Sequence, residues 1–539
     1  IPFDEIMAQQ EKDSRAQANK ITGASAKAMS RSDADEKDRQ DETKKKQVYY
    51  FAWDAKGTYK KSTVAAKART GGVLALRDAN RPFPVQADAR FGDTRIAFVG
   101  TLTDPLNMGA LDVRLWFSGT SMSHLYDLTG VTLPDTPPFA TEGHLKANLK
   151  KGASVYTYEN FTGRVGGSDL GGSLVFNTGG QRPSLTGKLK SNQLLFSDLA
   201  PLIGGGSNEE KAQRGDSVKQ PADKVLPVEP FKTDRWNTMD ADVQFTGVKI
   251  VHGERLPIDN LSTHLVLKDS VLVLDPLKFG VAGGTVGSNI RLDGSKTPMR
   301  GGFNLGARHL KLKELFPTFA PMQTSFGEMN GDASLTATGN SPAALLGSSN
   351  GEVKLLINDG AISGSLLELA GLNVGSYAVT KLFGDEVVKI NCMAADLVST
   401  NGVMESRLFA FDTEKALINV TGDINFRDEK INLDIVPHTK GFRLFSLRSP
   451  LYVHGTFKDP APGVHAGPLI LRGGGAVALA VFAAPVAALA ALVVPESGKA
   501  DATQCKPLLD DLRRNPPKAP AAGKASPAGK ASVAGKARG

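Results

Sequence analysis

The stretch Ala416-Leu-Ile-Asn-Val-Thr-Gly-Asp-Ile-Asn-Phe426 alternates apolar and polar side chains along most of its length. Its apolar residues of one parity are Ala416, Ile418, Val420, Ile424 and Phe426. Successive side chains of a β-strand point to opposite faces of the sheet, so this alternation predicts a half-buried strand. After a polar turn at 427–430, the same pattern returns at Ile431, Leu433 and Ile435. Two such strands joined so closely predict an antiparallel hairpin with one apolar face.

A second hairpin is predicted over residues 263–275, with Asp269 and Ser270 as its two-residue turn. Four leucines would share one face of this hairpin: Leu265, Leu267, Leu272 and Leu274. Valines make the opposite face apolar as well, so we expect both faces to be covered. Similar strand–turn–strand modules recur elsewhere at irregular spacing, which favours repeated hairpins over a strict sequence repeat.

Helical signals are few and short. They fall at 121–129, 195–203, 310–320, 341–347 and 363–384. None is long enough, or regularly enough placed between strands, to build the crossovers of an open doubly wound sheet. The sequence therefore predicts an all-β protein with a few short helices.

Composition divides the 539-residue chain into regions. Residues 1–47 hold one early apolar cluster and then a highly charged run without aromatic residues. They are expected to be disordered or helical, because they cannot bury enough apolar surface to fold alone. The predicted parts that follow are a first β region at 48–203, a loop or boundary at 204–230, and a second β region of the same elongated sheet at 231–470. Since the chain begins at Ile1 without a secretory signal, we expect an upstream targeting segment.

The C-terminal end contains an apolar helical segment at 471–497, followed by a Lys/Ala/Pro-rich tail at 498–539 that is expected to be disordered. Residues 473–494 carry no charge and are long enough to span a bilayer. They are rich in alanine and contain Pro485, so insertion would be marginal, and packing of the segment against the sheet stays open. Candidate membrane-contact residues are Leu479, Val481, Phe482, Val486, Leu489 and Leu492.

The net charge of +8 does not predict nucleic-acid binding. Lysines gather in the tail, whereas the central part mixes both signs and lacks a basic stripe with stacking aromatics. The two cysteines, Cys392 and Cys505, are too few for a disulfide scaffold or a cysteine-rich metal site. One bridge between them is possible in an oxidising compartment, but the sequence alone slightly favours two free thiols.

No motif indicates catalysis, a metal or a cofactor. The eight histidines form neither an HExxH motif nor a pair spaced by four residues. Residues 347–351 match G-x-S-x-G, but a predicted helix precedes them and a predicted strand follows. A nucleophile elbow needs the reverse order, so we interpret this stretch as a turn around Ser349. We expect no enzyme activity, no cofactor and no metal.

Several blocks resemble the AsmA family of Gram-negative envelope proteins. They include Leu194-Leu-Phe-Ser-Asp-Leu-Ala-Pro-Leu-Ile-Gly204 and the run from Leu256 to Asp269. The blocks 274–284, 331–341, 350–353 and 359–364 continue the likeness, which covers roughly residues 48–510. Each block alone is strand and turn chemistry, but their number and order make the resemblance specific.

The resemblance implies an elongated, twisted antiparallel β-sheet that forms an apolar groove for phospholipid or another acyl lipid. It also implies a periplasmic location, with an N-terminal inner-membrane anchor in the full-length protein, and no catalytic residues. The groove candidates are Leu265, Leu267, Leu272, Leu274, Ile418, Val420, Ile424, Phe426, Ile431, Leu433 and Ile435. The alternative is that these side chains pack against each other in a closed sandwich, since large apolar surfaces are rarely left bare.

The function expected from this resemblance is phospholipid transport between the inner and outer membranes and outer-membrane maintenance. The membrane contacts would come from the N-terminal anchor and from 473–494. Two alternatives stay open. One is a non-catalytic scaffold or regulator of outer-membrane protein assembly, whose protein partners the sequence does not name. The other is a hydrolase with an unrecognised site.

Overall fold

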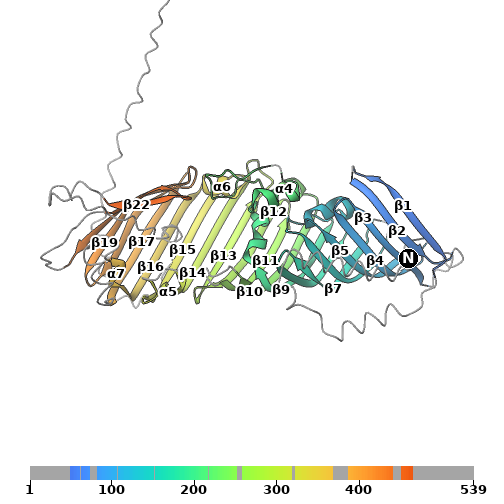
Figure 1. Cartoon of the computed structure of the whole chain (residues 1–539), viewed down its shortest axis with the longest axis horizontal. Helices are drawn as coiled ribbons and strands as arrows, with labels where there is room; N and C mark the ends of the chain where they lie inside the picture. Colours follow the sequence, from blue (N-terminus) through green and yellow to red (C-terminus); the bar gives the residue numbers. More distant parts are fainter. Residues whose placement is uncertain are drawn as a thin grey trace, which may run out of the picture.

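A computed structural model describes residues 49–464, except 61, 73–81, 106, 108, 151, 217, 252–257, 318–321, 368–386 and 441–450. Within the described residues, 22 strands form one elongated sheet (Figure 1). Each strand pairs with the next along the sequence, so the sheet grows in one direction from β1 to β22. The predicted fold class, a long, mostly antiparallel sheet with few short helices, is confirmed.

The strands of the first half are β1 (Phe51–Tyr59), β2 (Ser62–Thr70), β3 (Phe83–Phe91), β4 (Thr94–Thr103), β5 (Ala110–Gly119), β6 (Phe139–Asn148), β7 (Val155–Val165), β8 (Ser168–Asn177) and β9 (Ser184–Leu195). Those of the second half are β10 (Asp240–Val251), β11 (Ile258–Lys268), β12 (Val271–Val281), β13 (Gly284–Asp293), β14 (Arg300–Lys311), β15 (Phe326–Thr338), β16 (Asn350–Ser363), β17 (Val387–Thr400), β18 (Val403–Thr413), β19 (Ala416–Asn425), β20 (Lys430–Thr439), β21 (Leu451–Thr456) and β22 (Pro460–Val464).

The described helices are all short. They are η3 (Met122–Leu125), α3 (Tyr126–Thr129), η4 (Phe196–Ile203), α4 (Asn208–Arg214), η5 (Thr233–Arg235), α5 (Leu312–Leu315), α6 (Pro342–Leu346) and α7 (Gly364–Leu367). None of them is long and apolar enough to cross a bilayer. Most lie where the sequence predicts them, but α4 falls inside the predicted loop at 204–230.

Both predicted hairpins are confirmed. β11 and β12 are joined by Asp269 and Ser270, whose φ angles of 52° and 63° suit a type I′ turn. β19 and β20 form the other hairpin, in which Val420 pairs with Ile435 and Ile424 pairs with Ile431. The first of these strands ends at Asn425, one residue before the predicted limit.

One strand pair departs from the antiparallel pattern. β9 and β10 are parallel, from Ser184 beside Asp240 to Leu195 beside Val251. Two neighbouring strands can run parallel only if the connection between them carries the chain back to the end at which the first strand began. Residues 196–239 make that crossover, and they include η4, α4 and η5. The predicted boundary at 204–230 is therefore a segment packed on the sheet, and the expectation of no crossover is wrong at this one pair.

The G-x-S-x-G match is a turn, as predicted. α6 precedes it and β16 follows it. The Ser349 hydroxyl is buried and lies 2.8 Å from the Ser399 hydroxyl. A serine held this way, in helix-then-strand order, lacks the geometry of a nucleophile elbow.

Cys392 on β17 is buried and disulfide-bonded. This corrects the slight preference for two free thiols, since the chain has one other cysteine, which lies outside the described residues. The regions 1–47, 471–497 and 498–539 also lie outside them, and with them all six candidate membrane-contact residues.

Candidate functional site

One face of the sheet carries apolar side chains in cross-strand rows. The clearest row runs without a break from β5 to β13 through Leu111, Ala147, Tyr156, Phe176, Leu185, Ala241, Leu267, Leu272 and Leu292. Side chains that stand opposite each other on neighbouring strands share a face of the sheet. We call this surface the apolar face. Because hairpin follows hairpin in register, alternation within each strand becomes a continuous stripe along the molecule.

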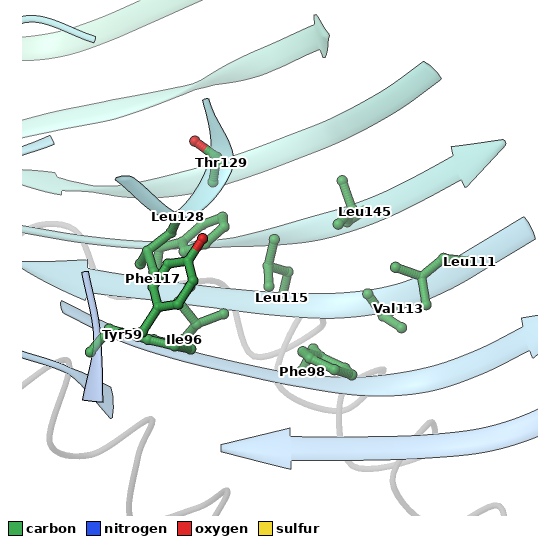
Figure 2. A pocket seen from close by; sticks show the side chains of 11 residues that line it. Tyr59, Ile96, Phe98, Leu111, Val113, Leu115, Phe117, Leu128, Thr129 and Leu145 are labelled. Atoms are coloured by element: carbon green, nitrogen blue, oxygen red, sulfur yellow. The ribbon is translucent and has the colours of Figure 1, made fainter. Parts of the chain in front are cut away.

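A cavity of about 410 Å³ lies on the apolar face near the β1 end (Figure 2). Its lining residues come mainly from β3 to β6 and from α3: Tyr59, Phe91, Ile96, Phe98, Leu111, Val113, Leu115, Phe117, Leu128, Thr129 and Leu145. Tyr59 and Thr129 alone among them carry a polar side-chain atom. We call it the apolar cavity. Its size falls in the range of small-molecule sites, but it lacks the cluster of polar groups that fixes a polar ligand.

A bulge in β7 shapes one side of this region. The register shifts between Tyr158 and Phe161, and the two rings stack with centroids 4.9 Å apart and an interplanar angle of 6°. Gly143 on the adjacent strand makes this arrangement possible, because a Cβ there would lie 2.5 Å from the Cβ of Phe161. Phe117, a cavity residue, meets the Tyr158 ring edge-on at 6.1 Å.

Two segments cover the middle of the apolar face. They are residues 120–138, between β5 and β6, and the crossover 196–239; together we call them the mid-sheet cover. Val131 and Leu133 pack over Leu185 and Val243, beside buried Met239. The crossover adds Phe231 and Trp236, which pack against Leu292 and Leu272. Figure 1 shows α4 near the middle of the long axis, between the two ends of the sheet.

Polar contacts tie the two segments of the cover together. The Thr132 hydroxyl lies 3.0 Å from the Thr238 hydroxyl, and Lys232 pairs with Asp135 at 2.9 Å. Arg235 stacks on the Tyr126 ring, with its guanidinium carbon 4.0 Å from the centroid. The cover is thus one connected unit that separates the apolar cavity from the apolar face of the later strands.

His124 anchors the mid-sheet cover to the turn between β3 and β4 and also joins the two segments of the cover. His124 Nδ1 lies 2.9 Å from Asp93 in the β3–β4 turn, while its Nε2 lies 3.2 Å from the Arg214 carbonyl oxygen. The hydrogen bond from His124 lowers the pKa of Asp93 to about 2, and the same bond raises the pKa of His124 above its ordinary value. This contact therefore has two charged partners at mildly acidic pH.

A buried ion pair lies within the crossover. Lys211 and Glu229 have side-chain exposures of 2 % and 8 %, and Lys211 Nζ stands 3.8 Å from Glu229 Oε2. Neither of these two atoms has a hydrogen-bond partner. Burial raises the pKa of Glu229, helped by nearby Asp216. The tertiary packing around this pair holds the two side chains together. Their mutual attraction compensates poorly for the hydration that both charges lose on burial.

The sequence-predicted groove residues lie on the apolar face, but none of them lines the apolar cavity. On β11 and β12, Leu267 pairs with Leu272 and Leu265 pairs with Leu274. Leu267 is buried, and its three companions are half-buried. These leucines share the face of the second-half strands next to the mid-sheet cover.

The candidates near the other end pack against neighbouring side chains. Ile418, Ile424 and Ile431 are buried, while Val420, Leu433 and Ile435 are half-buried. Ile418 belongs to the largest apolar cluster, together with residues of β12 to β17, and Ile431 packs against Val453. Phe426 lies just beyond β19 and meets the Phe457 ring edge-on at 5.8 Å. At this end the apolar face is largely filled by its own side chains.

The lining residues of the apolar cavity were not among the sequence candidates. Their signal is present, because Leu111, Val113, Leu115 and Phe117 alternate along β5 with Asp112, Arg114 and other residues of opposite parity. The sequence does not show where the two segments of the mid-sheet cover lie on the sheet. Their position decides which part of the apolar face stays open. Within the described residues, no group of three or more His, Cys, Asp or Glu side chains is placed to hold a metal ion.

Comparison with known proteins gives the family. The AsmA family profile matches residues 8–409, which is most of the chain. The chain belongs to the AsmA family. The AsmA family protein YhjG of Escherichia coli (strain K12) is 53 % identical to it over 474 residues, covering 86 % of this chain and 69 % of that protein. The resemblance stated from the sequence blocks is therefore confirmed. AsmA family proteins are envelope proteins of Gram-negative bacteria, and the family is non-catalytic.

Proposed function

We propose that this protein binds phospholipid or another acyl lipid on its apolar face and carries it between the inner and outer membranes. The supporting observation is the apolar cavity, which offers hydrocarbon contacts and almost no polar ones. Burial of each methylene is worth roughly 0.8 kcal/mol, so a few acyl carbons in the cavity give substantial binding. Apolar contacts have no preferred direction, so an acyl chain held this way can also slide along the surface.

The continuous row of apolar side chains supports movement beyond the cavity. It leads from Leu111 on β5, beneath the mid-sheet cover, to Leu292 on β13. The acyl chains of a lipid moving along this row contact apolar side chains at every strand, so the movement needs no polar group of the protein. On this proposal the protein works in the periplasm, anchored to the inner membrane in its full-length form, and maintains the outer membrane.

Binding of a phospholipid with a fluorescent acyl chain to the purified full chain tests the proposal. Phe98 lines the cavity, while Thr103 lies on the same strand, is exposed and points to the opposite face. We expect Phe98→Asn to weaken lipid binding by about tenfold, the equivalent of ~1.4 kcal/mol of lost apolar contact. Thr103→Asn is the matched control and should bind as the wild type does.

Two outcomes would count against the proposal. If the wild-type chain binds no lipid, its apolar face serves only as a core. If Phe98→Asn binds lipid as tightly as the wild type and Thr103→Asn do, the lipid is held elsewhere. A protein that binds no lipid but crosslinks to outer-membrane protein precursors would favour the scaffold alternative.

A further inference from the structure

The end of the sheet carries an exposed row of aromatic side chains. Phe51, Trp53 and Tyr59 on β1 are 41 %, 60 % and 49 % exposed, and every residue of this strand is exposed. We call these three residues the β1 aromatic strip. Among the exposed large hydrophobic residues of the described part of the chain, they are the one group of three that shares a strand; η4 holds the other group of three, Phe196, Leu202 and Ile203. Long apolar edge strands are normally covered or paired, so this strip needs a partner.

The strip lies on the apolar face. Trp53 pairs with Ala68, Ala68 with Ala87, and Ala87 with Phe98, a lining residue of the apolar cavity. Tyr59 belongs to both the β1 aromatic strip and the apolar cavity, since it lines the cavity and is half exposed. The hydrocarbon-lined surface therefore continues from the cavity to the outer edge of the first strand.

The opposite face of the same two strands is basic. In β1, β2 and their turn, the described residues carry Lys56, Lys60, Lys67 and Arg69 against the single acid Asp54. Strand alternation places Lys56, Lys67 and Arg69 on the face away from the aromatic strip. Long basic side chains can bury their stems and keep their charged ends in water beside anionic groups.

The side chains of the β1 aromatic strip favour a lipid surface over another protein strand as its partner. Trp and Tyr combine an apolar ring with a polar tip, which suits the boundary between hydrocarbon and water. The Trp53 indole nitrogen donates a hydrogen bond of 3.2 Å to the Thr70 hydroxyl, which holds the ring against the strand pair. A charged residue in mid-strand, here Lys56, discourages edge-to-edge pairing with another strand.

We propose that the β1 end of the sheet docks on an anionic phospholipid bilayer, with the β1 aromatic strip inserted at the interface and the basic residues beside the headgroups. The purpose of this contact rests on the proposed function, since it would bring the open end of the apolar cavity to a lipid source. The docking itself is a separate property of the surface, and its test is separate.

Quenching of Trp53 fluorescence by brominated phospholipids tests the docking. The full chain is mixed with vesicles of brominated phosphatidylcholine and phosphatidylglycerol, and Trp53→Phe is measured in parallel. The other tryptophans are buried or half-buried Trp116 and Trp236, so the difference between the two proteins reports Trp53. We expect strong quenching of this difference signal, and weaker quenching with phosphatidylcholine alone. The readout is local, so membrane contact by another segment does not mimic it.

Vesicle sedimentation gives a second measurement. Trp53→Ser should weaken binding to the anionic vesicles by about tenfold, because it removes a large apolar side chain from the interface. Phe326→Ser is the matched control, since Phe326 is also 60 % exposed but begins β15, far along the sheet. This control should bind as the wild type does.

Three results would overturn the docking proposal. They are an unquenched Trp53, equal binding by Trp53→Ser and the wild type, and a concentration-dependent dimer that Trp53→Ser abolishes. The last result would assign the strip to a second copy of the chain. A protein that takes up free lipid in the Phe98 assay but fails here keeps the proposed function and loses the docking surface.

Discussion

The hydroxyl of Thr132 lies 3.0 Å from the hydroxyl of Thr238, a residue 106 positions later in the chain. Thr132 belongs to the connection between β5 and β6, and Thr238 lies just before β10. This contact joins the two segments of the mid-sheet cover over the apolar face. The stripe of apolar side chains is therefore continuous beneath the cover but is not open along its whole length.

Locking the cover tests whether lipid must pass beneath it. Thr132→Cys/Thr238→Cys should form a disulfide under oxidation, and Cys392 is already bridged. We expect the oxidised variant to bind lipid in the cavity but to transfer it between vesicles more slowly than the reduced form. Thr132→Cys alone controls for the substitution. Equal transfer rates before and after oxidation would show that transit does not need the cover to open.

The contact between His124 and Asp93 predicts a pH dependence of the cover. The raised pKa of His124 adds stability below its unfolded value of 6.5, and this is lost as the pH rises through the folded value. The lowered pKa of Asp93 adds stability above its unfolded value of 3.8, and this is lost as the pH falls towards about 2. Asp135 supports the charged histidine from the same connection.

The pair should therefore stabilise the cover most between roughly pH 4 and 6.5. Hydrogen exchange of residues 120–138 can measure this. We expect His124→Gln to speed exchange clearly at pH 5.5 and much less at pH 8.5. A variant effect that is equal at both pH values would contradict the assignment of the charged pair.

The buried pair of Lys211 and Glu229 predicts a non-additive pair of substitutions. Lys211→Met leaves a buried carboxylate without its counter-ion and should destabilise the crossover by about 3–5 kcal/mol. Lys211→Met/Glu229→Leu removes both charges and should recover most of that loss. Hydrogen exchange of α4 and thermal unfolding are the measurements. If the double variant is as unstable as the sum of its single variants, the two side chains do not act as a pair.

How much of this could be read from the sequence depends on the range of the interactions. The turn at Asp269 and Ser270 was predictable because strand alternation and turn length are local properties. The start of α4 also had a local signal, since Ser207 and Glu210 form a capping box. The three glycines before it and the charged, proline-containing stretch after it favour a loop instead, so the sequence prediction misses this helix.

The parallel pairing of β9 and β10 had no such signal. It depends on where a 44-residue crossover ends in space, and neither strand differs in pattern from an antiparallel one. The location of the open cavity follows from that crossover and from the packing of Val131 and Leu133. Alternation in the sequence reveals which residues face one side of a sheet, but not which of them a distant segment covers.

Ile418 illustrates the difference between a core residue and a lipid contact. It is 5 % exposed and packs in the largest apolar cluster. Ile418→Ala should therefore lower the free energy of unfolding by about 2–5 kcal/mol. Val248→Ala, at a site 48 % exposed on β10, should change it by less than ~0.5 kcal/mol. Chemical denaturation decides the matter, and a neutral Ile418→Ala would place that side chain in an open groove.

Photocrosslinking at two adjacent residues of β6 tests the central claim most directly. Leu145 lines the apolar cavity, while neighbouring His144 is exposed on the opposite face beside Asp112. A photoreactive phenylalanine is placed at each position in turn in the full-length protein, and crosslinked phospholipid is measured by mass spectrometry. We predict lipid adducts at position 145 and none at position 144. Absence of lipid at position 145, or equal labelling at both positions, would contradict the account.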